Sequence, residues 1–110
     1  MKNVIRLALI ALLALPAGAE TFKNVSVVDN NCSRRVASNP DSHTKECALK
    51  CAASGFGIIT ADNQYLKFDE AGNQKVLSEI KSSSKADHLR VDVSGTVRGD
   101  TIQVSSVKVL

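Results

Sequence analysis

The chain has 110 residues, three cysteines, no tryptophan and a formal net charge of +3 at neutral pH. This length accommodates one domain at most. Two of the positive charges, Lys2 and Arg6, lie at the extreme N-terminus, so only +1 of the +3 remains on the rest of the chain. So small a charge, together with few aromatic side chains, argues against a nucleic-acid partner.

The first 19 residues have the features of a secretory signal peptide. An unbroken apolar run, residues 7–15, follows the two basic residues, and Ala17 and Ala19 provide the small side chains that signal peptidase requires. The run is shorter than the roughly 20 residues of a membrane-spanning helix. We therefore expect cleavage after Ala19, a periplasmic or extracellular bacterial protein without a membrane anchor, and a single domain over residues 20–110.

Residue patterns after the signal peptide predict five strands and two helices. The last third is the clearest, because apolar and polar residues alternate through residues 89–97 and again from Ile102. The alternation changes phase at Ser105 and Ser106, which predicts a β-bulge at that pair. The expected elements, in chain order, are strand 21–29, helix 43–54, strands 56–61 and 65–69, a helix from Asn73 to about Ser82, and strands 89–97 and 102–109.

This order predicts a mainly β fold. Five strands with a helix between the third and the fourth are typical of the OB-fold, a small five-stranded Greek-key barrel. The cysteine-bearing segment then forms a helical insertion between strands 1 and 2. A generic α+β sheet domain fits the same order less economically.

The insertion, residues 29–55, contains all three cysteines. Asp41 or Ser42 is expected to cap its helix, Gly55 to close it in a left-handed conformation, and Arg34 and Arg35 to be solvated loop residues. On a helix over residues 43–54, side chains four residues apart lie on the same face. The spacing therefore predicts one stripe made of His43, Cys47 and Cys51.

These residues also resemble a known pattern. The sequence contains Asp29-x-x-Cys32, then His43, Cys47-x-x-x-Cys51 and Gly55, and it ends in V-S-G-T-V-R-G-D-T-I-Q-V over residues 93–104. This arrangement resembles a family of small exported bacterial proteins of uncharacterised function that are OB-like. The similarity covers residues 25–109, and it implies the fold and export rather than an activity.

The cysteine and histidine side chains suggest a metal site. Three thiolates and an imidazole suit tetrahedral Zn²⁺ or Cu⁺. We expect the ligands to be Cys32, His43, Cys47 and Cys51, with Asp29 as a hydrogen-bonding partner that orients His43. The cofactor would be either of these two ions.

A disulfide is the alternative use of the same cysteines. A bond from Cys32 to Cys47 or to Cys51 would attach the insertion to the barrel, whereas a bond between Cys47 and Cys51 is disfavoured by their separation on a helix. One thiol would remain spare, so the protein would be a monomer or a dimer linked through that cysteine.

No catalytic residues are expected. The sequence has no Cys-x-x-Cys pair, no Gly-x-Ser-x-Gly motif and no convincing Ser/His/Asp set. We therefore expect an exported binding or structural module rather than an enzyme, with an unidentified protein or small ligand as its partner. A disulfide-stapled interaction domain without metal is the second hypothesis.

Overall fold

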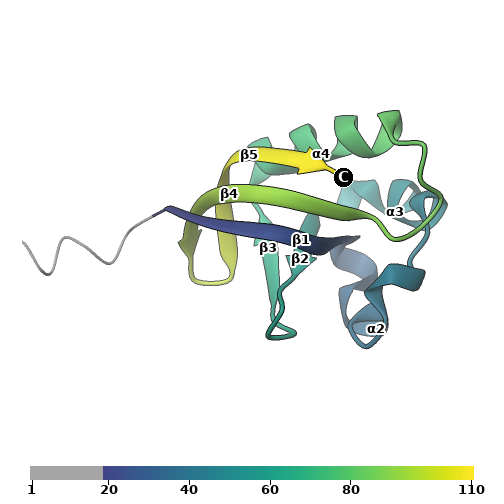
Figure 1. Ribbon diagram of the computed structural model, residues 1–110, viewed down its shortest axis with the longest axis horizontal. Helices are drawn as coiled ribbons and strands as arrows, with labels where there is room; N and C mark the ends of the chain where they lie inside the picture. The colour runs from purple at the N-terminus through teal and green to yellow at the C-terminus, as the bar shows by residue number, and fades with distance from the viewer. Residues whose placement is uncertain (1–18) are drawn as a thin grey trace, which may run out of the picture.

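The computed structural model describes residues 19–110, which form a closed five-stranded barrel (Figure 1). The strands lie in the order β1-β2-β3-β5-β4, and β4 returns to pair with β1. This order and the helix between β3 and β4 are those of an OB-like barrel, so the predicted fold class is confirmed. The strands are β1 (Ala19–Asp29), β2 (Phe56–Ile59), β3 (Tyr65–Phe68), β4 (Arg90–Arg98) and β5 (Thr101–Val109).

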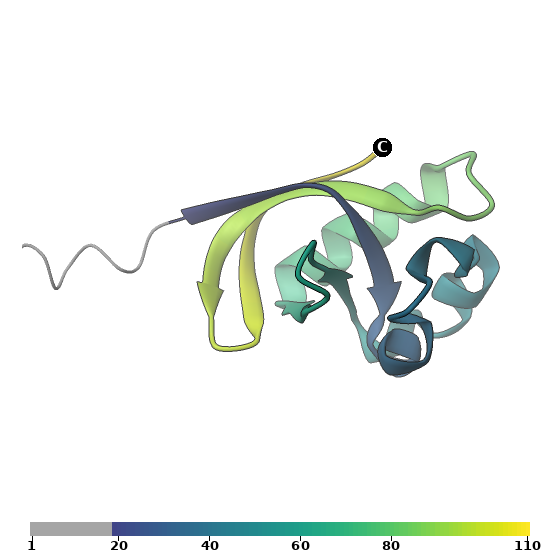
Figure 2. The ribbon, with the colours of Figure 1, turned by 60° about the horizontal axis from the view of Figure 1, so that its bottom comes forward.

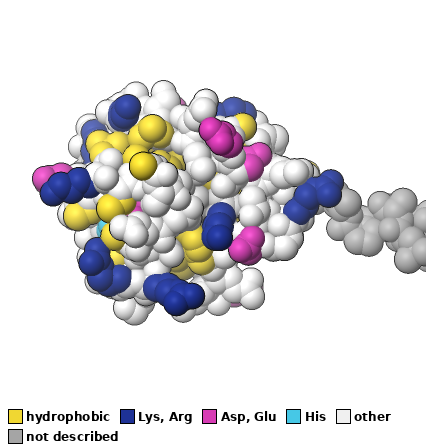
Figure 3. Space-filling model, turned by 180° about the vertical axis from the view of Figure 1, so that it is seen from behind, with side chains coloured by type: hydrophobic (Ala, Val, Ile, Leu, Met, Phe, Trp, Pro, Cys, Tyr) yellow, Lys and Arg dark blue, Asp and Glu magenta, His cyan; other side chains and the backbone are white. Residues whose placement is uncertain are grey.

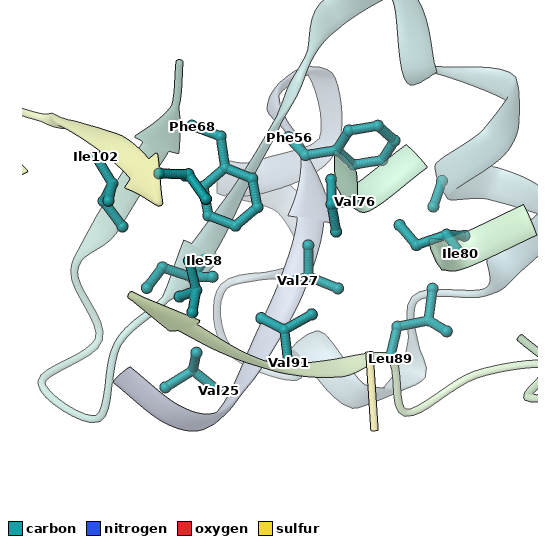
Figure 4. Close-up of a cluster of buried hydrophobic side chains, with 13 residues drawn as sticks. Val25, Val27, Phe56, Ile58, Phe68, Val76, Ile80, Leu89, Val91 and Ile102 are labelled. Atoms are coloured by element: carbon teal, nitrogen blue, oxygen red, sulfur yellow. The ribbon is translucent and has the colours of Figure 1, made fainter. Parts of the chain in front are cut away.

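Apolar side chains from all five strands and from helix α4 (Glu70–Ser82) fill the interior. Figure 4 shows Phe56, Val76 and Ile80 pointing toward one another, and each is at most 1% exposed. Strand positions alternate between this core and the surface, as in the buried Val91 and Val93 of β4. Burial of such side chains is the main favourable contribution to folding.

The hairpin of β4 and β5 contains the predicted β-bulge. Ser94 lies opposite Ser106, but the next pair is Gly95 with Val104, so Ser105 is the extra residue on β5. The hydroxyl of Ser105 donates to the Ser94 carbonyl at 3.0 Å. The phase change in the sequence therefore located the bulge correctly.

Helix α4 begins earlier than expected. Its N-cap is Asp69, whose carboxylate accepts a hydrogen bond from the Gly72 backbone at 3.0 Å, so the prediction that Asn73 caps this helix is wrong. Gly72 is required by packing, because a Cβ atom there would lie 2.4 Å from Val104 Cγ2. Asn73 instead accepts a hydrogen bond from the Phe56 backbone.

The N-cap of α4 and a side chain within it also protect the part of β5 that lies beyond its short pairing with β3. Asp69 accepts from the Val104 backbone at 3.2 Å, and Glu79 accepts from the Val109 backbone at 3.0 Å. A strand edge left bare is a template for unwanted pairing. The helix therefore packs on the core and, with its N-cap, also covers the part of β5 that β3 does not pair with.

The barrel closes through a short parallel pairing between β3 and β5. Only two residue pairs make this contact, Lys67 with Thr101 and Phe68 with Ile102. Backbone hydrogen bonds from Lys67 to Asp100 and from Asp69 to Ile102 join the strands at 2.8 and 3.0 Å. By contrast, β4 and β5 pair along nearly their whole length.

The insertion between β1 and β2 consists of short helical turns at one end of the barrel (Figure 2). These turns are η1 (Asn30–Cys32), α2 (Ser33–Val36), η2 (Pro40–Ser42), α3 (Lys45–Lys50) and η3 (Ala52–Ser54). The single helix expected over residues 43–54 is wrong, because His43 and Thr44 are extended and η3 is separate from α3. Gly55 closes the last turn with φ of 87°, a positive value as expected, but its ψ of 175° is extended rather than left-handed helical.

Residues 1–18 of the predicted signal peptide lie outside the described part of the chain. Ala19 is the first described residue and already belongs to β1, where it pairs with Thr96 of β4. Within residues 19–110, no helix has the length and apolar character needed to cross a membrane.

Candidate functional site

Asp29 is the buried centre of the polar cluster in the insertion. It is the last residue of β1, pairs with Phe56 of β2, and is 0% exposed. Its Oδ2 accepts a hydrogen bond from the Cys32 backbone at 3.0 Å, so the carboxylate caps the turn η1. The end of a barrel strand thus fixes both the carboxylate and the start of the insertion.

His43 packs against this carboxylate. Its Nε2 lies 2.6 Å from Asp29 Oδ1, and the side chain of His43 is almost fully buried. His43 is not helical: it follows η2 in an extended conformation, with φ of −69° and ψ of 126°. The structure therefore contains the expected Asp29–His43 pair. His43 is positioned by the extended link before α3 rather than by a helix face.

Two of the three cysteines join Asp29. One ligand atom each from Asp29, Cys32 and Cys51 lie within 4.8 Å of one another. Cys32 is 6% exposed, whereas Cys51 is partly exposed and its Sγ lies 3.6 Å from Asn31 Nδ2. We refer to Asp29, Cys32 and Cys51 as the cysteine–carboxylate cluster. In the described residues all three cysteines are free thiols.

Arg35 contributes a positive charge to the cluster. Its guanidinium donates to Cys32 Sγ at 3.1 Å from one turn further along α2. Burial raises the pKa of the Cys32 thiol, as do the charge of Asp29 and a hydrogen bond to it, while Arg35 acts in the opposite direction. Arg34 and Arg35 are exposed as expected, but they lie on α2 rather than in a loop, and Arg35 also contacts Cys32. Its spacing of three residues from Cys32 was the available signal.

Cys47 lies outside the cluster. The helix that carries it spans only Lys45–Lys50, and Thr44 caps it by accepting from the Cys47 backbone at 3.1 Å. Neither Asp41 nor Ser42 is the cap of this helix, and Cys51 is already its C-terminal boundary. The predicted stripe of His43, Cys47 and Cys51 is therefore not formed, and Cys47 is exposed.

A groove of about 630 Å³ borders this end of the barrel. It is lined by Arg34 of α2, Tyr65 and Lys67 of β3, and residues on both sides of them. The Tyr65 hydroxyl hydrogen-bonds to Asn30, and burial together with the Asp29 charge raises the pKa of Tyr65. The Asp29 carboxylate of the cluster therefore acts electrostatically on a side chain of the groove, and the sequence analysis did not predict the groove.

No family model, curated protein or solved structure matches the chain. The OB-like fold therefore rests on the strand order described above. On the face seen in Figure 3, lysine and arginine side chains are scattered among acidic and apolar ones rather than gathered into one patch.

Proposed function

We propose that this chain is an exported OB-like module that binds a metal ion through Cys32, Cys51 and Asp29. The convergence of two sulfur atoms and one carboxylate oxygen to within 4.8 Å carries this proposal. Export rests on the signal-peptide pattern of residues 1–19. The proposed location is the periplasm or the cell exterior.

The donor set suits Zn²⁺ and, through its sulfur atoms, Cu⁺. Donors bound to one Zn²⁺ lie about 3.3 to 3.8 Å apart when its bonds are ~2.0–2.3 Å long. A cluster spanning 4.8 Å at most reaches that spacing with side-chain movements on the order of 1 Å. Three protein donors would leave a fourth position of a tetrahedral ion for water or an external ligand.

In this proposal Asp29 and His43 exchange the roles expected from the sequence. Asp29 supplies a donor atom, while His43, 2.6 Å from its Oδ1, holds the carboxylate in position. Loss of such an outer partner typically lowers metal affinity ~10–100-fold. Cys47, which is exposed on α3, is not required.

The test is a Co²⁺ titration of reduced, chelator-treated protein, followed by displacement with Zn²⁺. We expect a thiolate-to-cobalt charge-transfer band at one ion per chain. Cys51→Ser should abolish the band, whereas the matched control Cys47→Ser should leave it unchanged. Loss of the band in Cys47→Ser with retention in Cys51→Ser would contradict the proposed ligands. A parallel Cu⁺ titration against a chromophoric competitor then identifies the preferred ion.

A disulfide-stapled interaction domain without metal is the second candidate. It is favoured by the approach of Cys32 and Cys51, because their sulfur atoms are within 4.8 Å in a chain predicted to be exported. Native and denatured masses of the mature protein distinguish the two. A mass two hydrogens lighter, one titratable thiol and no ion support the staple. Three free thiols with one ion support the metal site.

In both candidates the protein is a binding or structural module rather than an enzyme. The groove lined by Arg34, Tyr65 and Lys67 is large enough for a small ligand, whose pockets are ~300–1,000 Å³. We propose no nucleic-acid partner, since the chain after Ala19 has a formal charge of only +1 out of the +3 of the whole sequence.

A further inference from the structure

The two clustered cysteines differ in accessibility. Cys51 is partly exposed at the end of α3, whereas Cys32 is buried behind it and is 6% exposed. A thiol pair with one accessible and one buried member can exchange with an external disulfide in two ordered steps. We infer that Cys32 and Cys51 form a thiol–disulfide exchange site, in which Cys51 reacts first and Cys32 resolves the intermediate.

In the first step the Cys51 thiolate, after losing its proton to solvent, attacks an external disulfide R–S–S–R. A bond forms between Cys51 Sγ and one sulfur of the donor, and the donor S–S bond breaks. The departing thiolate takes up a proton and leaves as R–SH. The protein then carries a mixed disulfide at Cys51.

In the second step Cys32 attacks Cys51 Sγ and displaces the second R–SH. The sulfur atoms start no more than 4.8 Å apart and must reach ~2.05 Å, an approach of less than about 3 Å. The thiol proton of Cys32 is transferred to the departing thiolate, which leaves as the second R–SH. In sum, two protein thiols are oxidised to one disulfide, and the external disulfide is reduced to two thiols.

One neighbouring side chain supports the second step, because Arg35 donates to Cys32 Sγ at 3.1 Å. A guanidinium at that position stabilises the negative charge that develops on the attacking sulfur. No Cys-x-x-Cys spacing is needed, because the β1–β2 pairing brings Cys32 and Cys51 together from opposite ends of the insertion.

The inference shares its sulfur atoms with the proposed metal site but does not depend on it. Oxidation removes both thiolates as donors, so a bound ion would be released. The two ideas therefore fail separately: exchange without Co²⁺ binding overturns only the metal site, and Co²⁺ binding without exchange overturns only this inference.

The test uses reduced, metal-free mature protein in a Cys47→Ser background, with oxidised glutathione as the probe and intact mass as the readout. We expect this protein to become two hydrogens lighter without retaining glutathione. A further Cys32→Ser change should trap one glutathione on Cys51. A further Cys51→Ser change should leave Cys32, which should react with glutathione at least ~10-fold more slowly than Cys51 does in the other double variant. Stable glutathione adducts in the Cys47→Ser protein, or equal rates in the two double variants, would overturn the inference.

A second comparison does not depend on removing a cysteine. Arg35→Gln should slow the loss of glutathione from the mixed disulfide, whereas Arg98→Gln, a matched change at an exposed residue of β4, should not. Mixed-disulfide formation, the first step, should proceed at the same rate in both. Equal resolution rates in the two variants would exclude the role assigned to Arg35.

Discussion

The barrel and the insertion between β1 and β2 are stabilised by different interactions. The barrel is held by cross-strand pairing around a core in which Ile58, Val91 and Ile102 are 0% exposed. The insertion has short helical turns, and only Cys32 and Ala48 in it are buried apolar residues. Its shape depends instead on individual polar contacts, notably the Asp29–His43 and Asp41–Arg90 pairs.

This difference separates stability from chemistry. Apolar burial is non-directional and is shared among many residues, so no apolar side chain of the core needs an unusual environment. The insertion, together with Asp29 at the end of β1, instead fixes a carboxylate, two thiols and a guanidinium through directional contacts. We expect core changes to reduce global stability and insertion changes to affect mainly the cysteine–carboxylate cluster.

The largest effect should come from the barrel. Phe56→Ala removes a side chain that is 1% exposed and should lower the free energy of unfolding by ~3–5 kcal/mol. Urea denaturation followed by circular dichroism measures this. Leu110→Ala, at a residue 38% exposed, is the control and should change stability little. A small effect of Phe56→Ala would mean that the core does not dominate stability.

Asp29→Asn tests the point where the two regions meet. An amide cannot accept from both the Cys32 backbone and His43 as the carboxylate does, so one buried donor loses its partner. The free energy of unfolding should fall by ~1–3 kcal/mol. The cobalt charge-transfer band should also be lost, because Asp29 is one of the proposed ligands. The matched change Asp92→Asn, at an exposed contact, should leave the band intact.

The contact between Asp41 and Arg90 should respond to pH. The hydrogen bond from Arg90 lowers the pKa of Asp41, so ionised Asp41 stabilises the folded state above about pH 4. That contribution is lost as the pH falls through the lowered folded pKa. Asp41→Asn should cost ~1 kcal/mol at neutral pH, because the pair is about a third exposed, and the gap from wild type should close in acid. A constant gap would contradict the ion pair.

The smallest effect should come from the cap of α3. Thr44→Ala removes the acceptor for the Cys47 backbone and should cost ~1 kcal/mol or less. Amide exchange of residues 45–50 should quicken while exchange in β4 stays unchanged. Equal acceleration in both elements would show that the insertion and the barrel unfold as one unit, which would remove the distinction drawn above.

The sequence was informative where local patterns determine structure. Alternation predicted β4 and β5, and the phase change at Ser105 and Ser106 predicted the bulge. The element order was enough for the barrel class. The sequence was less informative at helix ends. Ser42 and Thr44 are both competent N-caps for α3, and only tertiary contacts select Thr44.

The candidate site needed long-range information. Helical spacing suggested that His43, Cys47 and Cys51 share one face, but α3 starts only at Lys45. The pairing of Asp29 with Phe56 instead brings Cys51 back to the end of β1. Similarly, the helix was expected to begin only at Asn73, although Gly72 lies inside α4 and allows it to approach Val104 closely.

The short parallel seam between β3 and β5 also has a consequence for how the barrel opens. Two residue pairs close it, so brief local opening should begin there and expose the Phe68 and Ile102 side chains first. Neither strand contains a member of the cysteine–carboxylate cluster. The barrel can therefore open locally between β3 and β5 while Asp29, Cys32 and Cys51 keep their positions relative to one another.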